Sequence, residues 1–381
     1  MKRILVIILI LLIAITIFGC KSNWETTTVD TAGNVGEYSS IAIDGNGIAH
    51  IAYLENLGEE LLGDSAVPYG NLKYATNADG TWEVITLDIY AGMTPRIIVD
   101  KNNNVHIVHS KLGVSSPENL TDLRYTTNAS GTWETVSINA KVVKGSDASI
   151  AVDTNLKIHI CAYNNEGAGT TSKGAKGGLR YLTNTSGEWT WVDLDNNPSA
   201  GNDTDIVVDS NDFVHISYLD KKEGLKYATN LSGDWNFEIV DNTPHVGWNT
   251  SIATDSNNKA HISYSDPADF LKPPGNGYLK YATNQSENWT TEILDREGAG
   301  LFTGLSIDND DIIHIAYYVY KEGLFTGRLM YISGNLNQWV KETIDDMEFV
   351  GLYCAIDTDI FNEPYFSYYD YLNQDLKFAE P

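Results

Sequence analysis

The sequence predicts an all-β protein, a seven-bladed β-propeller with four-stranded blades, and three observations support this fold class. Two motifs, one of the type Leu-Lys-Tyr and one that begins with Trp, recur together at a spacing of about fifty residues. Each repeat holds four short apolar stretches, separated by turns rich in Gly, Asn and Asp. Finally, each end of the chain carries part of a repeat, and the two parts complement each other.

The first complete repeat shows the four expected strands in order. They are "SIAID" (40–44), "HIAY" (50–53), "LKYATN" (72–77) and "WEVITLD" (82–88). Apolar and β-branched residues alternate or form short runs in each of them, which is typical of strands, and the spacing leaves no room for a helix.

The number of blades follows from counting the motifs. The Leu-Lys-Tyr motif begins at Leu72, Leu123, Leu179, Leu225, Leu279, Leu329 and Leu376, and the Trp that follows it is Trp82, Trp133, Trp189, Trp235, Trp289 and Trp339. The seventh motif has no Trp strand after it, whereas "NWETTTVD" (23–30) has no motif before it. We therefore expect residues 24–381 to form one ring that the N-terminal strand closes. A solenoid would need capping repeats, and a single barrel would not explain the fourfold grouping.

The first twenty residues have the features of an export signal. Lys2 and Arg3 precede the apolar run 4–18, which is short for a membrane-spanning helix. The following "IFGC" resembles the lipobox of bacterial lipoproteins, which implies cleavage before Cys20 and lipidation of that residue. We expect a signal peptide at 1–20, a linker at 21–23 and an extracytoplasmic protein anchored to the cell membrane or outer membrane. An uncleaved hydrophobic anchor is the alternative.

Composition narrows the partners. The formal net charge is −26, which repels phosphate backbones and disfavours nucleic-acid binding. Cys161 and Cys354 lie in apolar strand patterns, far apart in the repeat order, and we expect both to be buried and unpaired.

An Asp and a His recur six residues apart in six blades. The pairs are Asp44/His50, Asp100/His106, Asp153/His159, Asp209/His215, Asp255/His261 and Asp308/His314. A catalytic pair would occur once, so a motif in six blades is expected to be a building element of the hairpin. The seventh blade carries Tyr365 in place of the His. We expect no cofactor. Calcium is a minor hypothesis, because the turns are acidic but lack the residues of an EF-hand.

The short turns "NADGTW" (77–82) and "NASGTW" (128–133) resemble shortened Asp-boxes. Through them, the repeat from residue 24 to residue 381 is similar to surface propellers of the sialidase-like and fucose-lectin-like kind. The resemblance implies the fold rather than an activity. A sialidase needs three converging arginines, and the chain after residue 20 has only Arg96, Arg124, Arg180, Arg296 and Arg328, two of them in the repeat motif.

A functional site is expected where the blades differ from one another. The loops that lead into the innermost strands share a Gly, and the residues after it diverge. The candidate residues at the channel mouth are Tyr38, Arg96, Asp147, Asp203, Asp205, Trp248, Phe302 and Tyr353. Aromatic rings with carboxylates suit a carbohydrate or a peptide ligand, although the rings could instead plug the channel. The sequence thus favours a non-catalytic binding module. The alternatives are a glycosidase or lyase that uses carboxylates such as Asp147 and Asp203, and a structural role at the envelope.

Overall fold

The structure is a computed structural model that describes residues 24–62, 65–91, 94–112, 120–138, 142–143, 148–164, 177–243, 246–267, 277–320, 327–336 and 338–381. The expected signal peptide, Cys20 and the linker lie outside these residues. The described chain consists of strands and turns, and it holds no helix that is long and apolar enough to cross a membrane.

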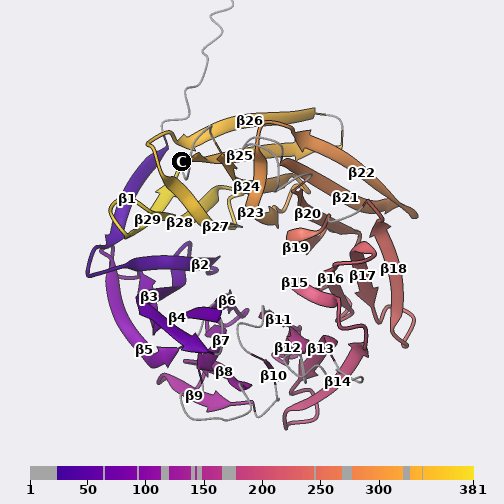
Figure 1. Cartoon of the computed structure of the whole chain (residues 1–381), viewed down its shortest axis with the longest axis horizontal. Helices are drawn as coiled ribbons and strands as arrows, with labels where there is room; N and C mark the ends of the chain where they lie inside the picture. Colours follow the sequence, from indigo (N-terminus) through magenta and orange to yellow (C-terminus); the bar gives the residue numbers. More distant parts are fainter. Residues whose placement is uncertain are drawn as a thin grey trace, which may run out of the picture.

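Seven antiparallel four-stranded blades surround a central channel (Figure 1), which confirms the predicted fold class. Blades 1 to 3, each given from the innermost to the outermost strand, are β2 (Val35–Ile43), β3 (Ala49–Leu62), β4 (Ser65–Thr76) and β5 (Glu83–Ala91); β6 (Arg96–Val99), β7 (Val105–Leu112), β8 (Leu120–Thr127) and β9 (Glu134–Ser137); and β11 (Ala148–Val152), β12 (Ile158–Asn164), β13 (Gly178–Thr183) and β14 (Thr190–Asp195). A short extra strand, β10 (Val142–Val143), pairs with β8.

The remaining blades follow the same order around the ring. Blades 4 to 7 are β15 (Ala200–Val208), β16 (Val214–Asp220), β17 (Gly224–Thr229) and β18 (Asn236–Asp241); β19 (Trp248–Thr254), β20 (Ala260–Asp266), β21 (Tyr278–Ser286) and β22 (Asn288–Asp295); β23 (Ala299–Ile307), β24 (Ile313–Tyr320), β25 (Gly327–Asn335) and β26 (Gln338–Asp345); and β27 (Val350–Thr358), β28 (Pro364–Asp370), β29 (Asp375–Glu380) and β1 (Glu25–Asp30).

The two ends of the chain close the ring within blade 7, as the sequence predicts. Strand β1 pairs antiparallel with β29, with Glu25 opposite Glu380 (Figure 1). The Trp24 ring packs edge-on against Tyr331 and Phe366, at centroid distances of 5.6 and 5.3 Å. This closure pairs the strand edges at the seam, which would otherwise be open to other chains.

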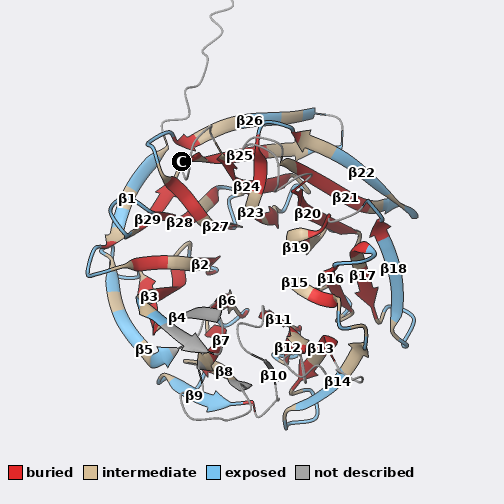
Figure 2. Ribbon diagram, viewed as in Figure 1, coloured by how far each residue is buried: buried red, intermediate tan, exposed pale blue. Residues whose placement is uncertain are grey.

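The core lies between neighbouring blades. The inner strands are largely buried and the outermost strands largely exposed (Figure 2). Each repeated Trp packs against the aromatic residue of the preceding blade's motif, which is Phe378 for Trp82 and a Tyr for the others. The centroid of the Trp133 ring, for example, lies 4.9 Å from that of the Tyr74 ring. Such edge-to-face pairs stabilise the contact beyond the apolar area that they bury. Cys161 and Cys354 are buried and unpaired, as expected.

A buried ion pair also joins successive blades. In blade 4, Asp241 ends the outermost strand, and in blade 5 both Lys280 and the Tyr264 hydroxyl bind its carboxylate, the hydroxyl at 2.7 Å. Burial alone would raise the pKa of Asp241, but these hydrogen bonds outweigh it and lower the pKa to about 2. In blade 6 Met330 replaces the Lys, and Lys341 supplies the cation instead, 3.0 Å from Asp295.

The repeated Asp and His face each other across the turn between the two innermost strands. Asp209 shows the arrangement: Oδ1 accepts the backbone N–H groups of Asn211 and Phe213, and Oδ2 lies 3.3 Å from His215 Nε2. The other His nitrogen, Nδ1, lies 2.5 Å from the Tyr227 hydroxyl. Burial lowers the pKa of His215, so the ring is neutral near pH 7. In blade 7 the Tyr365 hydroxyl donates to Asp359 at 3.2 Å and fills the place of the His.

Candidate functional site

The innermost strands of all seven blades line a cavity of about 370 Å³ in the central channel. This volume lies at the lower end of the range of roughly 300–1,000 Å³ that is typical of small-molecule sites. Because each blade presents the same strand to the cavity, differences among the seven strands determine its chemistry.

In six blades the residue two positions after the shared Gly is described, and these six residues form a ring at the mouth of the cavity. The described members are Tyr38, Thr94, Asp203, Asn249, Phe302 and Tyr353, and all of them line the cavity. Each has a left-handed backbone, with φ between 42° and 58°. This conformation costs about 1–2 kcal/mol for residues other than Gly. At Tyr38, Asp203, Asn249, Phe302 and Tyr353 it accompanies a β-bulge, such as the register shift between Leu352 and Ala355.

The shared Gly lets the bulged strand approach the neighbouring sheet. Gly36 has a φ of 107°, and a Cβ atom on it would lie 2.8 Å from the Cα atom of Leu376 in blade 7. A larger residue would therefore push the mouth ring away from the adjacent blade, which explains why a Gly precedes each ring residue.

The mouth ring has an aromatic arc over blades 6, 7 and 1. The Phe302 ring lies 4.6 Å from the Tyr353 ring, which in turn lies 4.4 Å from the Tyr38 ring. Burial is the main cause that raises the pKa of Tyr353 far above its usual value, so its hydroxyl stays protonated. The three rings form one apolar surface at the rim of the cavity.

A polar arc continues the mouth ring over blades 4 and 5. The backbone N–H and the side-chain amide of Asn249 both donate to Asp203 Oδ1 at 3.2 Å. The Phe302 N–H donates to Asn249 Oδ1 at 3.1 Å, which ties the polar arc to the aromatic one. Neighbouring blades thus hold the ring residues in place before any ligand arrives.

Asp205 lies two residues deeper in the channel and joins three blades. Oδ1 accepts the Ser149 hydroxyl at 2.5 Å, and Oδ2 accepts the Ser251 hydroxyl at 3.1 Å and the Ile252 N–H at 2.9 Å. Both carboxylate oxygens therefore accept hydrogen bonds from neighbouring blades. Asp205 thus stabilises the channel wall and is poorly placed to act as a base.

Arg96 is the one Lys or Arg among the described residues that line the cavity. It is half-buried, and its guanidinium donates to the Pro95 carbonyl at 3.3 Å. In the described part of the chain it forms no ion pair, unlike Arg124 and Arg180, which bind Asp88 and Asp193. Most of its donors remain available to a ligand in the cavity.

Asp357 also lines the channel, and its carboxyl group differs from that of Asp205 in having a raised pKa. It accepts the N–H groups of Ile43 at 2.8 Å and Thr358 at 2.9 Å, and it faces the Ser306 hydroxyl at 3.4 Å. Burial outweighs these hydrogen bonds and raises its pKa to about 6.

The structure brings together six of the eight predicted site residues. Tyr38, Arg96, Asp203, Asp205, Phe302 and Tyr353 line the cavity. Trp248 precedes Asn249 in β19, is partly exposed, and does not belong to the cavity lining found among the described residues. Asp147 lies outside the described residues.

Sequence reasoning missed Thr94, Asn249 and Asp357. Thr94 and Asn249 were detectable, because they stand two residues after the shared Gly as Tyr38 does. Asp357 lies four residues after Tyr353, as Ala42 lies four residues after Tyr38 in blade 1. Aligning the innermost strands of the repeats at this position would have shown a carboxylate in blade 7 where blade 1 has an Ala. Among the described residues, no group of three or more His, Cys, Asp or Glu side chains is arranged to hold a metal ion.

No known protein family matches the sequence, and no curated protein does so either. Solved structures are similar in fold. An ulvan lyase of a polysaccharide lyase family, bound to -[GlcA(1-4)Rha3S]-, gives a TM-score of 0.59 at 10% identity, over 93% of this chain and 95% of that chain. The Aleuria aurantia lectin bound to Fucα1-6GlcNAc gives 0.54 at 11% identity, over 84% and 98%.

A leech intramolecular trans-sialidase gives a TM-score of 0.50 at 10% identity, over 94% of this chain and 70% of that chain. These neighbours confirm the predicted resemblance to sialidase-like and fucose-lectin-like propellers. At such identities the similarity shows the fold alone.

Proposed function

We propose that this protein is a non-catalytic saccharide-binding module, held at the cell envelope by a lipid on Cys20. The observation that supports binding is the mouth ring, in which the aromatic arc of Phe302, Tyr353 and Tyr38 stands beside the polar arc of Asp203 and Asn249. A sugar ring has apolar C–H faces and a rim of hydroxyl groups, so it can use both arcs at once.

The preorganisation of the site favours binding. The polar arc is hydrogen-bonded to its neighbours, and the left-handed backbone of each described ring residue is fixed by the sheet. Little conformational entropy is therefore lost when a ligand binds. Two of the similar folds were solved with saccharides bound, which agrees with this choice over a peptide.

A glycosidase or lyase is the second candidate, and Asp357 is the observation that favours it. A carboxyl group with a pKa of about 6 has the property of a general acid near neutral pH. Both carboxylate oxygens of Asp205 and both of Asp357 accept hydrogen bonds, which counts against this alternative, because a catalytic pair needs two available carboxyl groups.

Anchoring would place the propeller at the membrane surface. Trp24 already packs in blade 7, four residues after Cys20, so a lipid on Cys20 would hold the propeller close to the bilayer. Metabolic labelling with a palmitate analogue tests this part. The label should enter the wild type and be absent from Cys20→Ser, and a labelled Cys20→Ser variant would contradict it.

Glycan-array binding tests the saccharide proposal. The double variant Phe302→Ala/Tyr353→Ala should weaken binding at least about tenfold, because it removes the aromatic arc. Phe237→Ala is the matched control, since this ring is 43% exposed on the outermost strand β18, far from the channel, and binding should not change. Equal binding by both variants and the wild type would refute the site.

Mass spectrometry of the bound saccharide separates binding from catalysis. The wild type should return the saccharide at its original length after prolonged incubation. Shortened or unsaturated products that disappear in Asp357→Asn would establish the enzyme instead.

A further inference from the structure

A second aromatic surface lies on the edge of blade 7, beside the mouth ring. We call it the blade 7 platform. It consists of the stacked Phe349 and Tyr371 rings, together with the exposed Leu372 and Met347, which stand next to Tyr371 and two residues before Phe349 in the sequence. The Tyr371 and Phe349 rings stack nearly parallel, with an interplanar angle of 29° and a centroid distance of 6.5 Å. Tyr371, Met347 and Leu372 are 45%, 56% and 68% exposed. Exposed apolar side chains gathered at one point usually mark a binding surface.

One buried residue links the platform to the mouth. The Tyr369 ring lies 6.1 Å from the Tyr353 ring of the aromatic arc and 6.3 Å from the Tyr371 ring of the platform. Its hydroxyl donates to Asn34 Oδ1 at 2.7 Å, and the residue is only 2% exposed. Tyr369 therefore holds the two aromatic surfaces at a fixed separation.

The backbone is strained where the platform is built. Phe349 has a φ of 69°, which is a rare conformation for a bulky residue. Its carbonyl accepts the Tyr371 N–H at 3.0 Å, so the two platform rings are set against each other by the backbone. Strain of this kind is maintained at functional sites more often than elsewhere.

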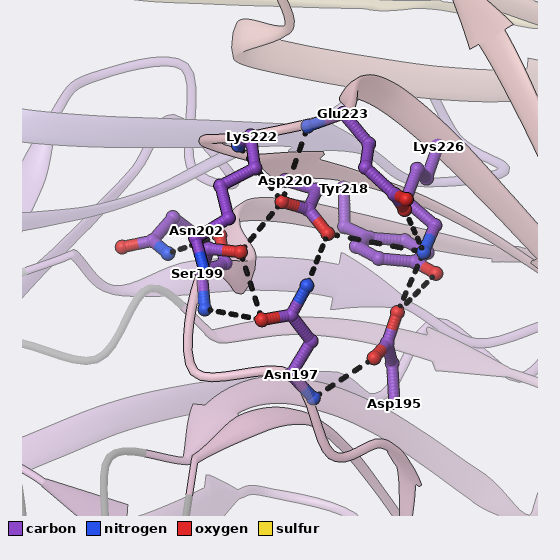
Figure 3. A network of polar contacts seen from close by, with 9 residues as sticks. All are labelled: Asp195, Asn197, Ser199, Asn202, Tyr218, Asp220, Lys222, Glu223 and Lys226. Carbon is purple, nitrogen blue, oxygen red and sulfur yellow. Dashed lines mark hydrogen bonds and ion pairs between the residues drawn. The ribbon is translucent and has the colours of Figure 1, made fainter.

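Blade 4 shows that the fold does not require these rings. Its turn has the same framework: the Lys221 N–H donates to the Ser199 carbonyl at 2.9 Å, as Tyr371 does to Phe349. Asp220 caps this turn through the Lys222 and Glu223 N–H groups, as Asp370 caps the blade 7 turn through Leu372 and Asn373. In blade 4 the positions of the platform rings hold Lys221 and Ser199, and Ser199 belongs to a polar network with Asp220 (Figure 3).

We propose that the blade 7 platform binds further sugar units of the chain whose first unit occupies the mouth ring, so that the ligand is an oligosaccharide or a polysaccharide. This inference rests on the proposed saccharide function. Continuity with the aromatic arc supports it, and so does the polar border, in which Asn34 and Asn56 donate to Glu37 at 3.2 and 3.0 Å.

Other occupants fit less well. A stable protein–protein interface involves about 20–30 residues on each side, and this platform offers four side chains. An anionic membrane surface is disfavoured, because Asp346 and Glu348 are exposed on either side of Met347 and would repel it. A saccharide chain needs only stacked rings with hydrogen-bonding groups beside them.

The test uses a glycan array with ladders of one to six sugar units from cellulose, xylan, mannan, polygalacturonate and alginate. Wild-type affinity should rise with length on at least one ladder. Tyr371→Lys copies the blade 4 residue into blade 7; it should weaken binding of the longest members about tenfold and leave the shortest members unchanged. Lys221→Ala in blade 4 is the control and should change neither.

The outcomes separate the two proposals. If the wild type binds the ladder and Tyr371→Lys keeps the full dependence on length, the platform is wrong, while the mouth site stands. If affinity does not rise with length, the ligand is not a chain. If the wild type binds none of the ladders, the proposed saccharide function falls and this inference falls with it. Circular dichroism melting shows whether Tyr371→Lys is folded, and Tyr371→Ser serves as a second variant if it is not.

Discussion

Blades 4 and 7 share a framework and differ in what it presents. In both, an Asp caps the turn between the second and third strands, and one backbone hydrogen bond ties that turn to the preceding loop. Around this framework blade 4 builds a network of Asn197, Ser199 and Asp220 (Figure 3), whereas blade 7 presents stacked aromatic rings. The repeat thus determines the backbone of the turn, whereas the side chains at its exposed positions differ between blades and can serve a function.

The largest expected effect comes from a residue of the shared framework. Asp209 in blade 4 is fully buried and accepts two backbone N–H groups beside His215. Asp209→Ala should lower the free energy of unfolding by about 3 kcal/mol, because these donors would be buried without partners. Chemical denaturation measures it. A loss below about 0.5 kcal/mol would show that the framework carries little stability.

Acid should destabilise the protein through the buried His that six blades share and that Tyr365 replaces in blade 7. Burial lowers the pKa of His215 and of its counterparts His50, His106, His159, His261 and His314 below the usual 6.5. Below pH 6.5 the unfolded chain gains protons that the folded chain excludes, so the melting temperature should fall with pH. The buried His109, whose pKa is lowered to about 4, adds to this effect. Asp357, Asp375 and Glu380 oppose it, because their raised pKa values make the folded state relatively more stable as pH falls, but they are three groups against seven.

Thermal melting between pH 8 and pH 5 measures how steeply the melting temperature falls with pH. His215→Tyr, which copies the blade 7 residue into blade 4, should make this fall less steep. A melting temperature that is flat or rises toward pH 5 would contradict the neutral state of these rings.

The reverse exchange should have a small effect. Tyr365→His gives blade 7 the residue of the other six blades, opposite the same Asp359 carboxylate. Because a His fits this position elsewhere in the ring, stability should change by about 1 kcal/mol or less. Denaturant titration checks this, and a loss of about 3 kcal/mol would mean that blade 7 is built differently from its neighbours.

The smallest effect is expected on the exposed edge of blade 4. Lys222 is exposed, and its backbone N–H donates to Asp220. An Ala at this position would keep that backbone hydrogen bond. Lys222→Ala should therefore change the free energy of unfolding by less than about 0.5 kcal/mol. The same denaturant titration would reveal a larger loss, which would show that the blade 4 edge has a role of its own.

The sequence predicts the fold well because the fold is a repeat. Seven copies of one pattern reveal strands, blade number and ring closure, and the complementary ends locate Trp24 in blade 7. The candidate site is only partly predictable, because five of the innermost strands, β2, β15, β19, β23 and β27, contain a bulge. The register shift between Trp248 and Ser251 makes Asn249 a lining residue, and no count of alternating residues reveals such a shift.

Depth in the channel is hidden from the sequence for a related reason. Burial raises the pKa of Asp357, and two of its hydrogen-bond partners, Ile43 and Ser306, come from blades 1 and 6, far from it in the chain. The platform needs Tyr369 to face both Tyr353 and Tyr371, and that arrangement depends on how the blade 7 turn packs.

Calorimetric titration with the saccharide that binds best on the array tests the central claim most directly. The wild type and the Phe237→Ala control should bind it with the same affinity, and Phe302→Ala/Tyr353→Ala should bind it at least about tenfold more weakly at an unchanged melting temperature. Equal affinities for all three proteins would show that the channel mouth is not the binding site.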